Sequence, residues 1–276
     1  MKTRRCLTPD EVKCEELRIL KAFDAFCRSR DLSYSLAGGT LLGAVRHKGF
    51  IPWDDDIDVA MGRPYYDKLL ELQRDFEAES GFKVVPFRGT KISTTPYIKI
   101  INPLIWVQAD IEMFVENLWI DVFPIDALPV SEIDLRWLYA RASLRRKLII
   151  ISGVKPESGS TPLKRLVKRA IKKVLSIPGV IERQSLRLNS LARDLPYGST
   201  PYVGGIAWGL YGAGERVSLE GFDSCIPLSF EGYDFSCMSC WDDYLTGLYG
   251  EYMRLPSEDM RKSHDVVAWR EVGGGD

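Results

Sequence analysis

The sequence predicts an α/β (α+β) protein in which helices pack on a sheet of about five strands. The stretch from Thr8 to Ser29 has apolar residues at helical spacing and begins with an N-cap threonine, a proline and an early glutamate, which indicates a long helix. Short runs of β-branched and aromatic residues follow, separated by Gly and Pro, as expected for strands. After Pro129 the pattern changes to longer, basic, helical segments.

The order of the elements follows from these patterns. Strands are expected at residues 34–36, 56–61, 82–85, 97–101, 106–114 and 119–123. Helices are expected at residues 8–29, 40–45, 64–79, 131–151, 162–175, 181–193 and 241–249. We group the elements into a catalytic core (1–130), a basic helical region (131–200) and a C-terminal segment rich in glycine and aromatic residues (201–276) that packs back on the core.

The charge of the chain is distributed unevenly. The net charge is −1 over 276 residues, yet the twelve Lys and Arg side chains between Leu135 and Leu175 are opposed only by Glu157. Such asymmetry indicates an anionic partner, and no nucleic-acid motif accompanies it. In residues 163–175 apolar and basic residues occupy opposite faces, so we expect the basic helices of 135–175 to contact an anionic membrane surface. The alternative is a helix packed on the domain with a solvated basic face.

The cellular location follows from what the sequence lacks. The N-terminal residues carry no apolar stretch of the signal-peptide kind, and no apolar run approaches the roughly 20 residues of a spanning helix. Six cysteines in a chain of this length do not indicate a disulfide framework. We therefore expect a cytoplasmic protein, held peripherally on the inner face of the membrane.

Three aspartates at strand positions predict the chemistry. Asp56 and Asp58 alternate with apolar residues, so in a strand they project from the same face. Asp121 has the same setting within another apolar run. Carboxylates on half-buried strands are costly unless they are compensated, and a divalent cation such as Mg²⁺ compensates several at once. We therefore predict a Mg²⁺ site at these three residues and phosphoryl-transfer chemistry.

A glycine pair lies upstream of these aspartates. Gly38 and Gly39 follow a predicted strand, and Thr40 begins a predicted helix. Glycines let the backbone approach a ligand closely, and a helix N-terminus offers free N–H groups to a phosphate. Next to a carboxylate pair, this arrangement predicts a nucleotide diphosphate or triphosphate site.

The segment from Leu36 to Asp58 resembles the signature of the LicD family of phosphocholine transferases, related to fukutin and fukutin-related protein. Residues 120–126 and 249–256 resemble two further blocks of that family. The resemblance implies a mixed-sheet nucleotidyltransferase core like that of DNA polymerase β. It assigns two Mg²⁺ ions, with Mn²⁺ as an alternative, to Asp56, Asp58 and Asp121, and gives Gly38, Gly39 and Thr40 the glycine-turn role.

The same resemblance implies transfer of a phospho-alcohol from a CDP donor to a glycan hydroxyl, with release of CMP. CDP-choline is the leading donor, and the acceptor is a glycan precursor of the teichoic acid or lipopolysaccharide type. An acceptor glycan carried on a membrane lipid is one form of this expectation. Three alternatives remain open. These are a ribitol- or glycerol-phosphate donor, a true nucleotidyltransferase that releases pyrophosphate, and a non-catalytic membrane-binding scaffold.

Further candidates for substrate contacts surround these motifs. Arg46, His47 and Lys48 lie in the loop before the first aspartates, and Arg46 is the best phosphate clamp because guanidinium binds phosphate bidentately. For Lys48 the alternative is a solvated loop charge. Lys99 lies on a strand and would contact the donor phosphates or pair with an acidic neighbour. His264 is a nucleotide contact or a zinc ligand.

A choline headgroup calls for aromatic rings, because a quaternary ammonium is held by cation–π attraction. The candidates are Trp53, Trp106, Trp119, Trp208, Tyr202 and Tyr211, with Trp53 the best single candidate. The alternative is that these rings belong to the core.

The remaining acidic and cysteine residues receive weaker assignments. Asp54 and Asp55 are expected to cap the turn or hold water, and Asp126 to make turn hydrogen bonds. Asp110 and Glu112 form a weaker carboxylate pair, expected to be exposed. Cys225, Cys237 and Cys240 are zinc ligands or buried or free thiols, with buried or free thiols favoured by their loose spacing.

Overall fold

The computed structural model describes residues 3–86, 95–108, 116–153, 179–261 and 267–272, with the single residues 173 and 177. Its strands are β1 (Thr3–Cys6), β2 (Ser35–Leu36), β3 (Asp58–Gly62), β4 (Lys83–Val85), β5 (Ile98–Gln108), β6 (Asn117–Ala127), β7 (Tyr202–Gly204), β8 (Val217–Ser218), β9 (Cys225–Phe230), β10 (Tyr233–Met238) and β11 (Val267–Val272). Its α-helices are α1 (Pro9–Ser29), α2 (Gly38–Arg46), α3 (Arg63–Glu71), α4 (Gln73–Ser80), α5 (Glu132–Gly153), α7 (Val180–Ala192), α8 (Leu219–Asp223) and α9 (Trp241–Tyr249). Two 3₁₀-helices, η2 (Gly212–Glu215) and η3 (Glu258–Met260), complete the set.

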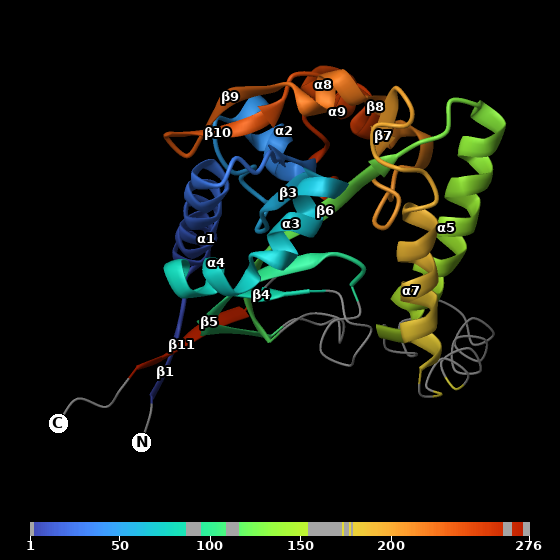
Figure 1. Cartoon of the computed structure of the whole chain (residues 1–276). Coiled ribbons are helices and arrows are strands. Elements are labelled where there is room, and N and C mark those ends of the chain that lie inside the picture. The colour runs from blue at the N-terminus through green and yellow to red at the C-terminus, as the bar shows by residue number, and fades with distance from the viewer. Residues whose placement is uncertain are drawn as a thin grey trace.

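A nine-stranded mixed sheet forms the centre of the molecule (Figure 1). Its main path runs β1-β11-β5-β6-β3-β2, with β4 beside β5 and β7 beside β6 and β8. β3 and β6 are parallel, whereas the other pairs between the described strands are antiparallel. The predicted α/β class with one main sheet is therefore confirmed, and the sheet is larger than the five strands expected.

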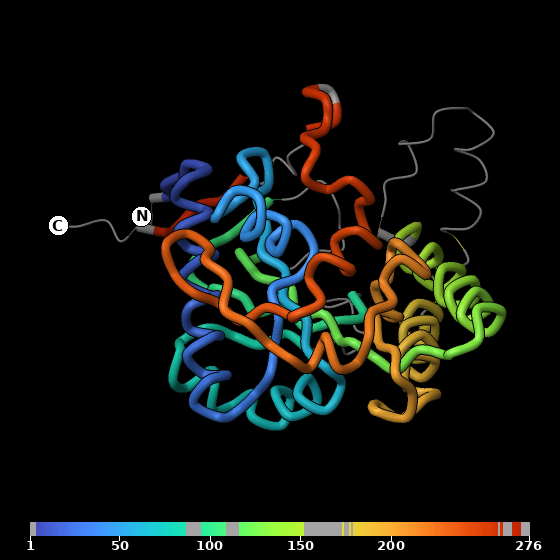
Figure 2. The backbone as a smooth tube through the Cα atoms, turned by 90° about the horizontal axis from the view of Figure 1, so that it is seen from above, coloured from blue at the N-terminus to red at the C-terminus, as the bar shows by residue number. Residues whose placement is uncertain are grey.

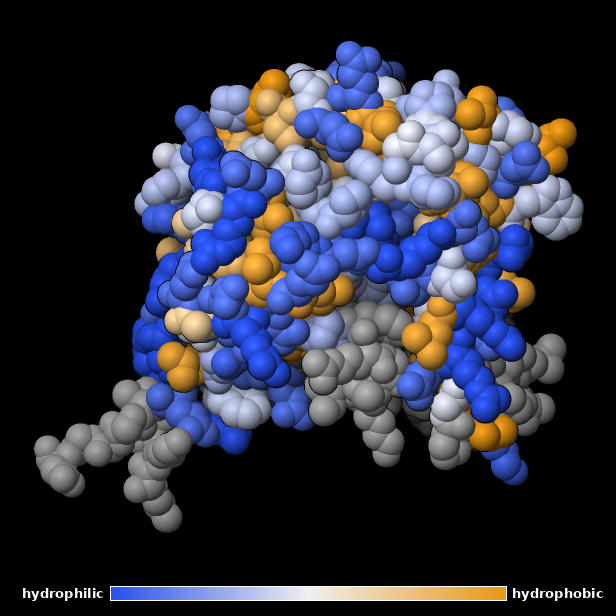
Figure 3. Space-filling view, in the orientation of Figure 1, coloured by the Kyte–Doolittle hydropathy of each residue, from blue (hydrophilic) through white to orange (hydrophobic). Residues whose placement is uncertain are grey.

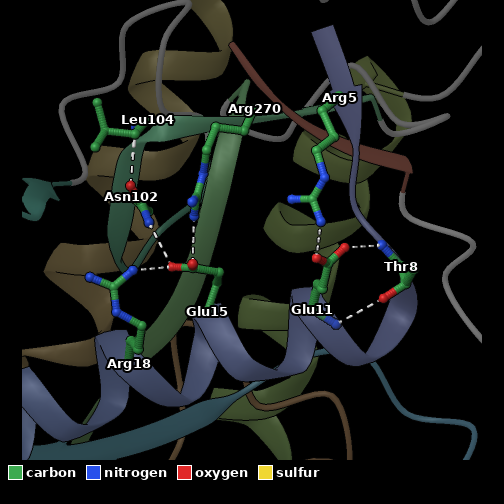
Figure 4. A network of polar contacts seen from close by, with 8 residues as sticks. All are labelled: Arg5, Thr8, Glu11, Glu15, Arg18, Asn102, Leu104 and Arg270. Carbon is green, nitrogen blue, oxygen red and sulfur yellow. Dashed lines mark hydrogen bonds and ion pairs between the residues drawn. The ribbon is translucent and has the colours of Figure 1, made fainter. Parts of the chain in front are cut away.

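Helix α1 begins where the sequence predicted. The Thr8 hydroxyl accepts a hydrogen bond from the Glu11 amide, and the Glu11 carboxylate accepts one from the Thr8 amide at 2.9 Å. A second carboxylate on α1, that of Glu15, accepts a hydrogen bond from the Arg270 guanidinium of β11 at 2.5 Å and one from the Asn102 side-chain amide of β5 at 3.3 Å (Figure 4). β11 also pairs with β1, the strand that precedes α1. Both ends of the described chain therefore lie at the same edge of the sheet.

Several predicted elements differ in extent. The strands expected at 97–101 and 106–114 form one strand, β5, with an irregular register between Asn102 and Trp106. The helix expected at 64–79 is divided at Leu72 into α3 and α4. The change of direction at Leu72 accompanies burial of Phe76, which packs edge-on against Phe26 of α1 at 5.2 Å between ring centroids. The helices expected at 131–151, 181–193 and 241–249 are confirmed as α5, α7 and α9.

Besides a small cluster where α1, β5, β6 and β11 meet, two hydrophobic cores organise the described residues. The larger core joins α1, α2 and the sheet to the hairpin β9–β10 and to α9, so the orange C-terminal residues pass over the blue N-terminal part in Figure 2. The smaller core lies between α5 and α7, which lie side by side (Figure 1). The division into three regions stays a prediction. The helix expected at 162–175, the pair Asp110 and Glu112, and His264 lie outside the described residues.

None of the described helices is both long enough and apolar enough to cross a lipid bilayer.

Candidate active site

Three charged side chains form a row across the middle of the sheet. Asp58 on β3 and Asp121 on β6 are register partners in the parallel pair, so their Cα atoms are neighbours at about 4.8 Å. Lys99 on β5 is the register partner of Asp121 on its other side. Register partners project from the same face of a sheet, and the Lys99 ammonium lies 2.5 Å from the Asp121 carboxylate. Asp121 is therefore beside Asp58, although 63 residues separate the two in the sequence.

The start of helix α2 is locked against the start of β3. The Asp58 amide donates to the Thr40 hydroxyl at 2.8 Å, and the Ala37 amide donates to the Asp58 carbonyl at 3.0 Å. Gly38 has a φ of +50°, and a Cβ atom there would lie 2.7 Å from an Asp58 carboxylate oxygen. Only glycine therefore fits Gly38 without displacing Asp58. The glycine pair is the first turn of the helix, not a turn before it as predicted.

Helix α2 lacks a side-chain cap at its N-terminus. The N-cap residue is Ala37, which has no side chain that can accept from the first-turn amides. Gly38 and Gly39 line the cleft next to the aspartates, and the Gly38 amide makes a long hydrogen bond to the Tyr244 hydroxyl at 3.4 Å. A helix N-terminus without a side-chain cap favours binding of an anion, because its free amides and the helix macrodipole both present positive charge.

A cleft of about 420 Å³ opens over these residues. Four carboxylates, Asp54, Asp56, Asp58 and Asp121, line part of it. The pKa of Asp58 is raised well above its usual range, first because the group is buried and then because the carboxylates of Asp56, Asp121 and Asp54 repel its charge. Burial and the same acidic loop also raise the pKa of Glu16 on α1. Negative charge is therefore concentrated here beyond what Lys99 offsets.

The carboxylates fit a divalent cation in their chemistry. Carboxylate oxygens are the hard ligands that Mg²⁺ prefers, and the raised pKa of Asp58 indicates charge that a cation would relieve. Asp121 is held by Lys99, however, and among the described residues no three His, Cys, Asp or Glu side chains already converge closely enough to hold an ion. An ion would therefore have to draw these side chains together by rotation.

The same test gives no support to zinc at the cysteines. Cys225, Cys237 and Cys240 are all free, and no group of metal-binding side chains forms around them in the part of the chain that the structure describes. Burial raises the pKa of the Cys237 thiol to about 12 and that of Cys240 to about 11, which disfavours the thiolate that zinc requires. Buried or free thiols are the reading that these observations favour.

The loop candidates lie beside the cleft and not in its lining. The Arg46 guanidinium donates to the Tyr252 carbonyl at 2.7 Å. His47 packs edge-on against Trp53, with 6.3 Å between ring centroids. Lys48 is exposed, has a φ of +61° and accepts at its carbonyl from the Glu231 amide. Lys99 pairs with an acidic neighbour, which is one of the two roles expected for it.

The cleft has an aromatic wall that only partly matches the aromatic candidates. The rings that line it are Tyr97, Phe123, Trp208, Tyr211, Tyr244 and Tyr249. Trp208 and Tyr211 were among the candidates, and Trp208 contacts Tyr97 edge-on at 5.2 Å.

The other four aromatic candidates lie elsewhere. Trp53 lines a neighbouring cleft with Asp55 and has the Arg261 guanidinium 4.9 Å above its ring. Trp119 lies 4.3 Å from the Lys99 ammonium, and Tyr202 lies 4.7 Å from the Arg216 guanidinium. Trp106 lies on β5, where it is the register partner of Trp269 on β11.

Glu215 is a cleft residue that sequence reasoning missed. It lies in η2, is 7% exposed, and accepts from the Tyr211 amide at 3.2 Å. Burial raises its pKa to about 7. The only sequence signal for it is the surrounding Gly- and aromatic-rich segment. Asp126 was also misjudged: it lies on β6 and forms a buried bidentate salt bridge with Arg63, at 2.6 and 2.7 Å, where turn hydrogen bonds were expected.

Comparison with known proteins indicates the class to which this fold and cleft belong. Residues 31–138 match the LicD/FKTN/FKRP nucleotidyltransferase domain. The chain is also 29% identical, over 262 residues, to the lipopolysaccharide cholinephosphotransferase LicD of Haemophilus influenzae, an alignment that covers 94% of this chain and 97% of that protein. These similarities identify a transferase that resembles the LicD family in this domain and, over nearly its whole length, a LicD cholinephosphotransferase. A stretch of 60 residues is 41% identical to an uncharacterized protein of Rickettsia prowazekii, covering 22% of this chain and 23% of that one.

Proposed function

We propose that the chain transfers phosphocholine from CDP-choline to a hydroxyl of a cell-surface glycan precursor, of the lipopolysaccharide or teichoic acid type, and releases CMP. The observation that carries the proposal is the cleft, which joins carboxylates and a helix N-terminus to an aromatic wall. The name of the Haemophilus relative, a lipopolysaccharide cholinephosphotransferase, supports the same reaction. We also propose that the core has the topology of the DNA polymerase β superfamily.

Each part of the cleft has a role in this reaction. The first-turn amides of α2 at Gly38 and Gly39 bind the donor diphosphate, with the helix dipole adding to the attraction. Asp56, Asp58 and Asp121 hold Mg²⁺, which supplies charge neutralisation to the diphosphate and the leaving CMP. Thr40 positions Asp58 through the hydrogen bond from the Asp58 amide. Thr40 is buried and is not part of the lining of the cleft, so we assign it this positioning role in place of a direct substrate contact.

The transfer exchanges one P–O bond for another. The bond between the choline phosphorus and the bridging oxygen breaks, and the acceptor oxygen forms the new bond. CMP leaves with the bridging oxygen, and the acceptor proton passes to a carboxylate of the cleft. Lys99 stabilises the charged form of Asp121, so Asp121 is suited to holding a cation more than to keeping a proton.

The aromatic wall supplies a place for the choline headgroup. Trp208 and Tyr97 meet edge-on, and Tyr211 meets Tyr249 in the same way at 5.3 Å. A trimethylammonium group is attracted to such ring faces, and Glu215 adds a carboxylate behind the wall. Ribitol and glycerol carry no positive charge and gain neither contribution. Choline is therefore the headgroup that this wall favours.

Product analysis tests the reaction. The purified chain is given Mg²⁺, an acceptor glycan and, in turn, CDP-choline, CDP-ribitol, CDP-glycerol or CTP. We expect CMP from CDP-choline above the other donors. Pyrophosphate from CTP would instead establish a nucleotidyltransferase. Absence of product from all donors, together with membrane binding, would support a scaffold without catalysis.

Two variants only three residues apart, one at the start of β3 and one in the loop before it, test the site. Asp58→Asn should lower CMP release by about 10³-fold or more, because it removes a cleft carboxylate. Asp55→Asn is the control, since Asp55 lines the neighbouring cleft with Trp53 and not this one. Binding of Mn²⁺, measured by electron paramagnetic resonance, should weaken in the first variant only. Equal turnover in the two variants would refute the assignment.

The headgroup role of the wall is tested separately. CDP-choline is compared with its neutral isostere, the CDP ester of 3,3-dimethylbutanol, so that size is held constant while charge changes. Trp208→Leu should weaken CDP-choline binding by about tenfold and leave the neutral donor nearly unchanged. If the variant weakens both donors equally, the wall provides shape and not charge recognition, while CMP release still supports the reaction.

A further inference from the structure

Helix α5 has one face turned into the protein. Leu135, Tyr139, Ala142 and Ile149 recur every three to seven residues along it and are all buried. They pack in the smaller core with residues of α7. This spacing gives a single buried stripe, as expected for a helix on the surface of a domain.

The opposite face of α5 is also apolar. Ile133, Trp137, Ala140 and Leu144 recur at intervals of four, three and four residues, which places them in one line along the helix. The three large members are 69%, 67% and 64% exposed, respectively. We call these four residues the outer stripe. Scattered apolar residues are normal on a surface, but four in line on one helix form an interaction face.

The outer stripe continues into a hollow. Trp137 lines a cleft of about 480 Å³ together with Val130, Leu138 and Leu195, so the apolar surface extends from the helix toward α7. Asp134, Asp194 and Arg141 also line this cleft, so its acids lie at the N-terminal end of the stripe. Val130 is itself 59% exposed. On the face shown in Figure 3, apolar side chains lie among hydrophilic ones over the α5–α7 pair.

Cations flank the outer stripe. Arg136, Arg141 and Lys147 are exposed and lie within one turn of stripe residues. The two other cations nearby are used inside the protein: Arg145 donates to Gln184 at 3.1 Å, and Arg146 donates to the Ile206 carbonyl at 2.6 Å. The exposed cations are therefore those beside the apolar line.

The acids on this helix lie near its N-terminal end. Glu132 pairs with Arg216, and Asp134 lies in the first turn, so both stand at one end of the outer stripe. Beyond Asp134, the charged residues that flank the outer stripe on α5 are all positive.

We propose that the outer stripe of α5 docks the protein on an anionic lipid bilayer. Exposed apolar side chains enter the headgroup region, Trp137 lies at the level that tryptophan prefers, and the flanking cations meet anionic headgroups. A second copy of the chain fits less well, because a symmetric contact through this stripe would bring its flanking cations close to the flanking cations of the other copy. The surface is distinct from the catalytic cleft, and the proposal does not depend on the reaction.

Vesicle co-sedimentation tests the proposal on the full chain. One set of vesicles contains phosphatidylcholine alone and the other also contains phosphatidylglycerol. We expect binding to the anionic vesicles, weakening as salt screens the cations. Trp137→Ser combined with Leu144→Ser should weaken binding by about tenfold or more. Leu104→Ser is the matched control, since Leu104 is 70% exposed but lies on β5, and it should bind as the parent does.

Two further arms separate the possible outcomes. Arg141→Glu combined with Lys147→Glu should abolish the preference for anionic over neutral vesicles. Sedimentation velocity without lipid should give one species for the parent and for the stripe variants. The proposal is overturned if the parent chain does not bind anionic vesicles, or if the stripe variants bind them as well as the Leu104→Ser control does. It is also overturned if the parent forms a dimer without lipid and the stripe substitutions abolish that dimer.

Discussion

The acidic cleft and helix α5 use charge in opposite ways. In the cleft, Lys99 and Asp121 are both buried on the adjacent strands β5 and β6 and form a salt bridge, so the protein itself compensates part of the acidic charge. On α5, exposed cations flank an apolar line and are compensated by solvent. The first arrangement fixes side chains for chemistry at a cost in desolvation, whereas the second leaves them available to an outside surface. Substitutions should therefore separate the two regions by their effect on stability.

Removing the cleft cation should have the largest effect. Lys99→Met leaves Asp121 buried without its salt-bridge partner, which should destabilise the fold by roughly 3–5 kcal/mol. The control is Lys83→Met on the neighbouring β4, whose pair with Glu77 is more accessible, the two side chains being 51% and 18% exposed, and should contribute less than about 1 kcal/mol. Urea unfolding measures both. Equal losses would mean that the buried pair in the cleft matters no more to stability than the more exposed pair on β4.

The effect of Mg²⁺ on stability should also differ between Lys99→Met and the parent chain. If a cation binds at Asp58 and Asp121, it replaces the charge that Lys99→Met removes. Mg²⁺ should then raise the free energy of unfolding of this variant more than that of the parent chain. An identical response of both proteins would count against a cation at these carboxylates.

Glu215 predicts a pH dependence of stability. Burial raises its pKa from 4.5 to about 7, so the folded state binds the proton more tightly than the unfolded state. The resulting stabilisation is complete below pH 4.5 and is lost as the pH rises through about 7. The loss amounts to at most roughly 3 kcal/mol.

Glu215→Gln removes this titration. The variant should match the parent near pH 4.5 and exceed it in unfolding free energy at pH 8, as followed by thermal denaturation across pH. Glu132→Gln is the control, because Glu132 is an exposed acid on α5 that pairs with Arg216. Parallel pH curves for the parent and Glu215→Gln would contradict the raised pKa.

Gly38 should show an intermediate effect. Gly38→Ala adds a Cβ atom 2.7 Å from the Asp58 carboxylate at a positive φ, which should cost about 1–2 kcal/mol and displace Asp58. Gly81→Ala is the control for strain alone, because Gly81 has a φ of +75° and open space around its Cα. CMP release should fall in the first variant and persist in the second. Equal activity would show that the close approach to Asp58 is not needed.

Local patterns made part of this architecture predictable. Helix α1 follows from a capping signature within four residues, and α5, α7 and α9 from apolar spacing within each segment. Asp58 and Asp121 were found because their strands carry charge among apolar neighbours, whereas Asp56, expected on the same strand as Asp58, precedes β3. The prediction of a shared cation site placed the aspartates together, and the register of β3 and β6 supplies the structural basis for Asp58 and Asp121.

The rest depends on contacts between distant segments. Trp53 is only three residues from Asp56, yet the turn closed by the Asp54 amide and the Ile51 carbonyl places it in the neighbouring cleft. Glu215 is an ordinary acid in sequence, and only the packing of η2 buries it. The pairing of β1 with β11 joins residues more than 260 positions apart, which no local period reports.

The outer stripe of α5 should give the smallest change in stability. Leu144→Ser replaces a side chain that is 64% exposed, so the free energy of unfolding should change by less than about 0.5 kcal/mol. Leu135→Ser on the inner face of the same helix buries a hydroxyl in the smaller core and should cost about 2–5 kcal/mol. Urea unfolding of the two variants compares the faces of one helix directly. A large loss from Leu144→Ser would mean that the stripe is covered within the protein and is not a surface kept for a membrane.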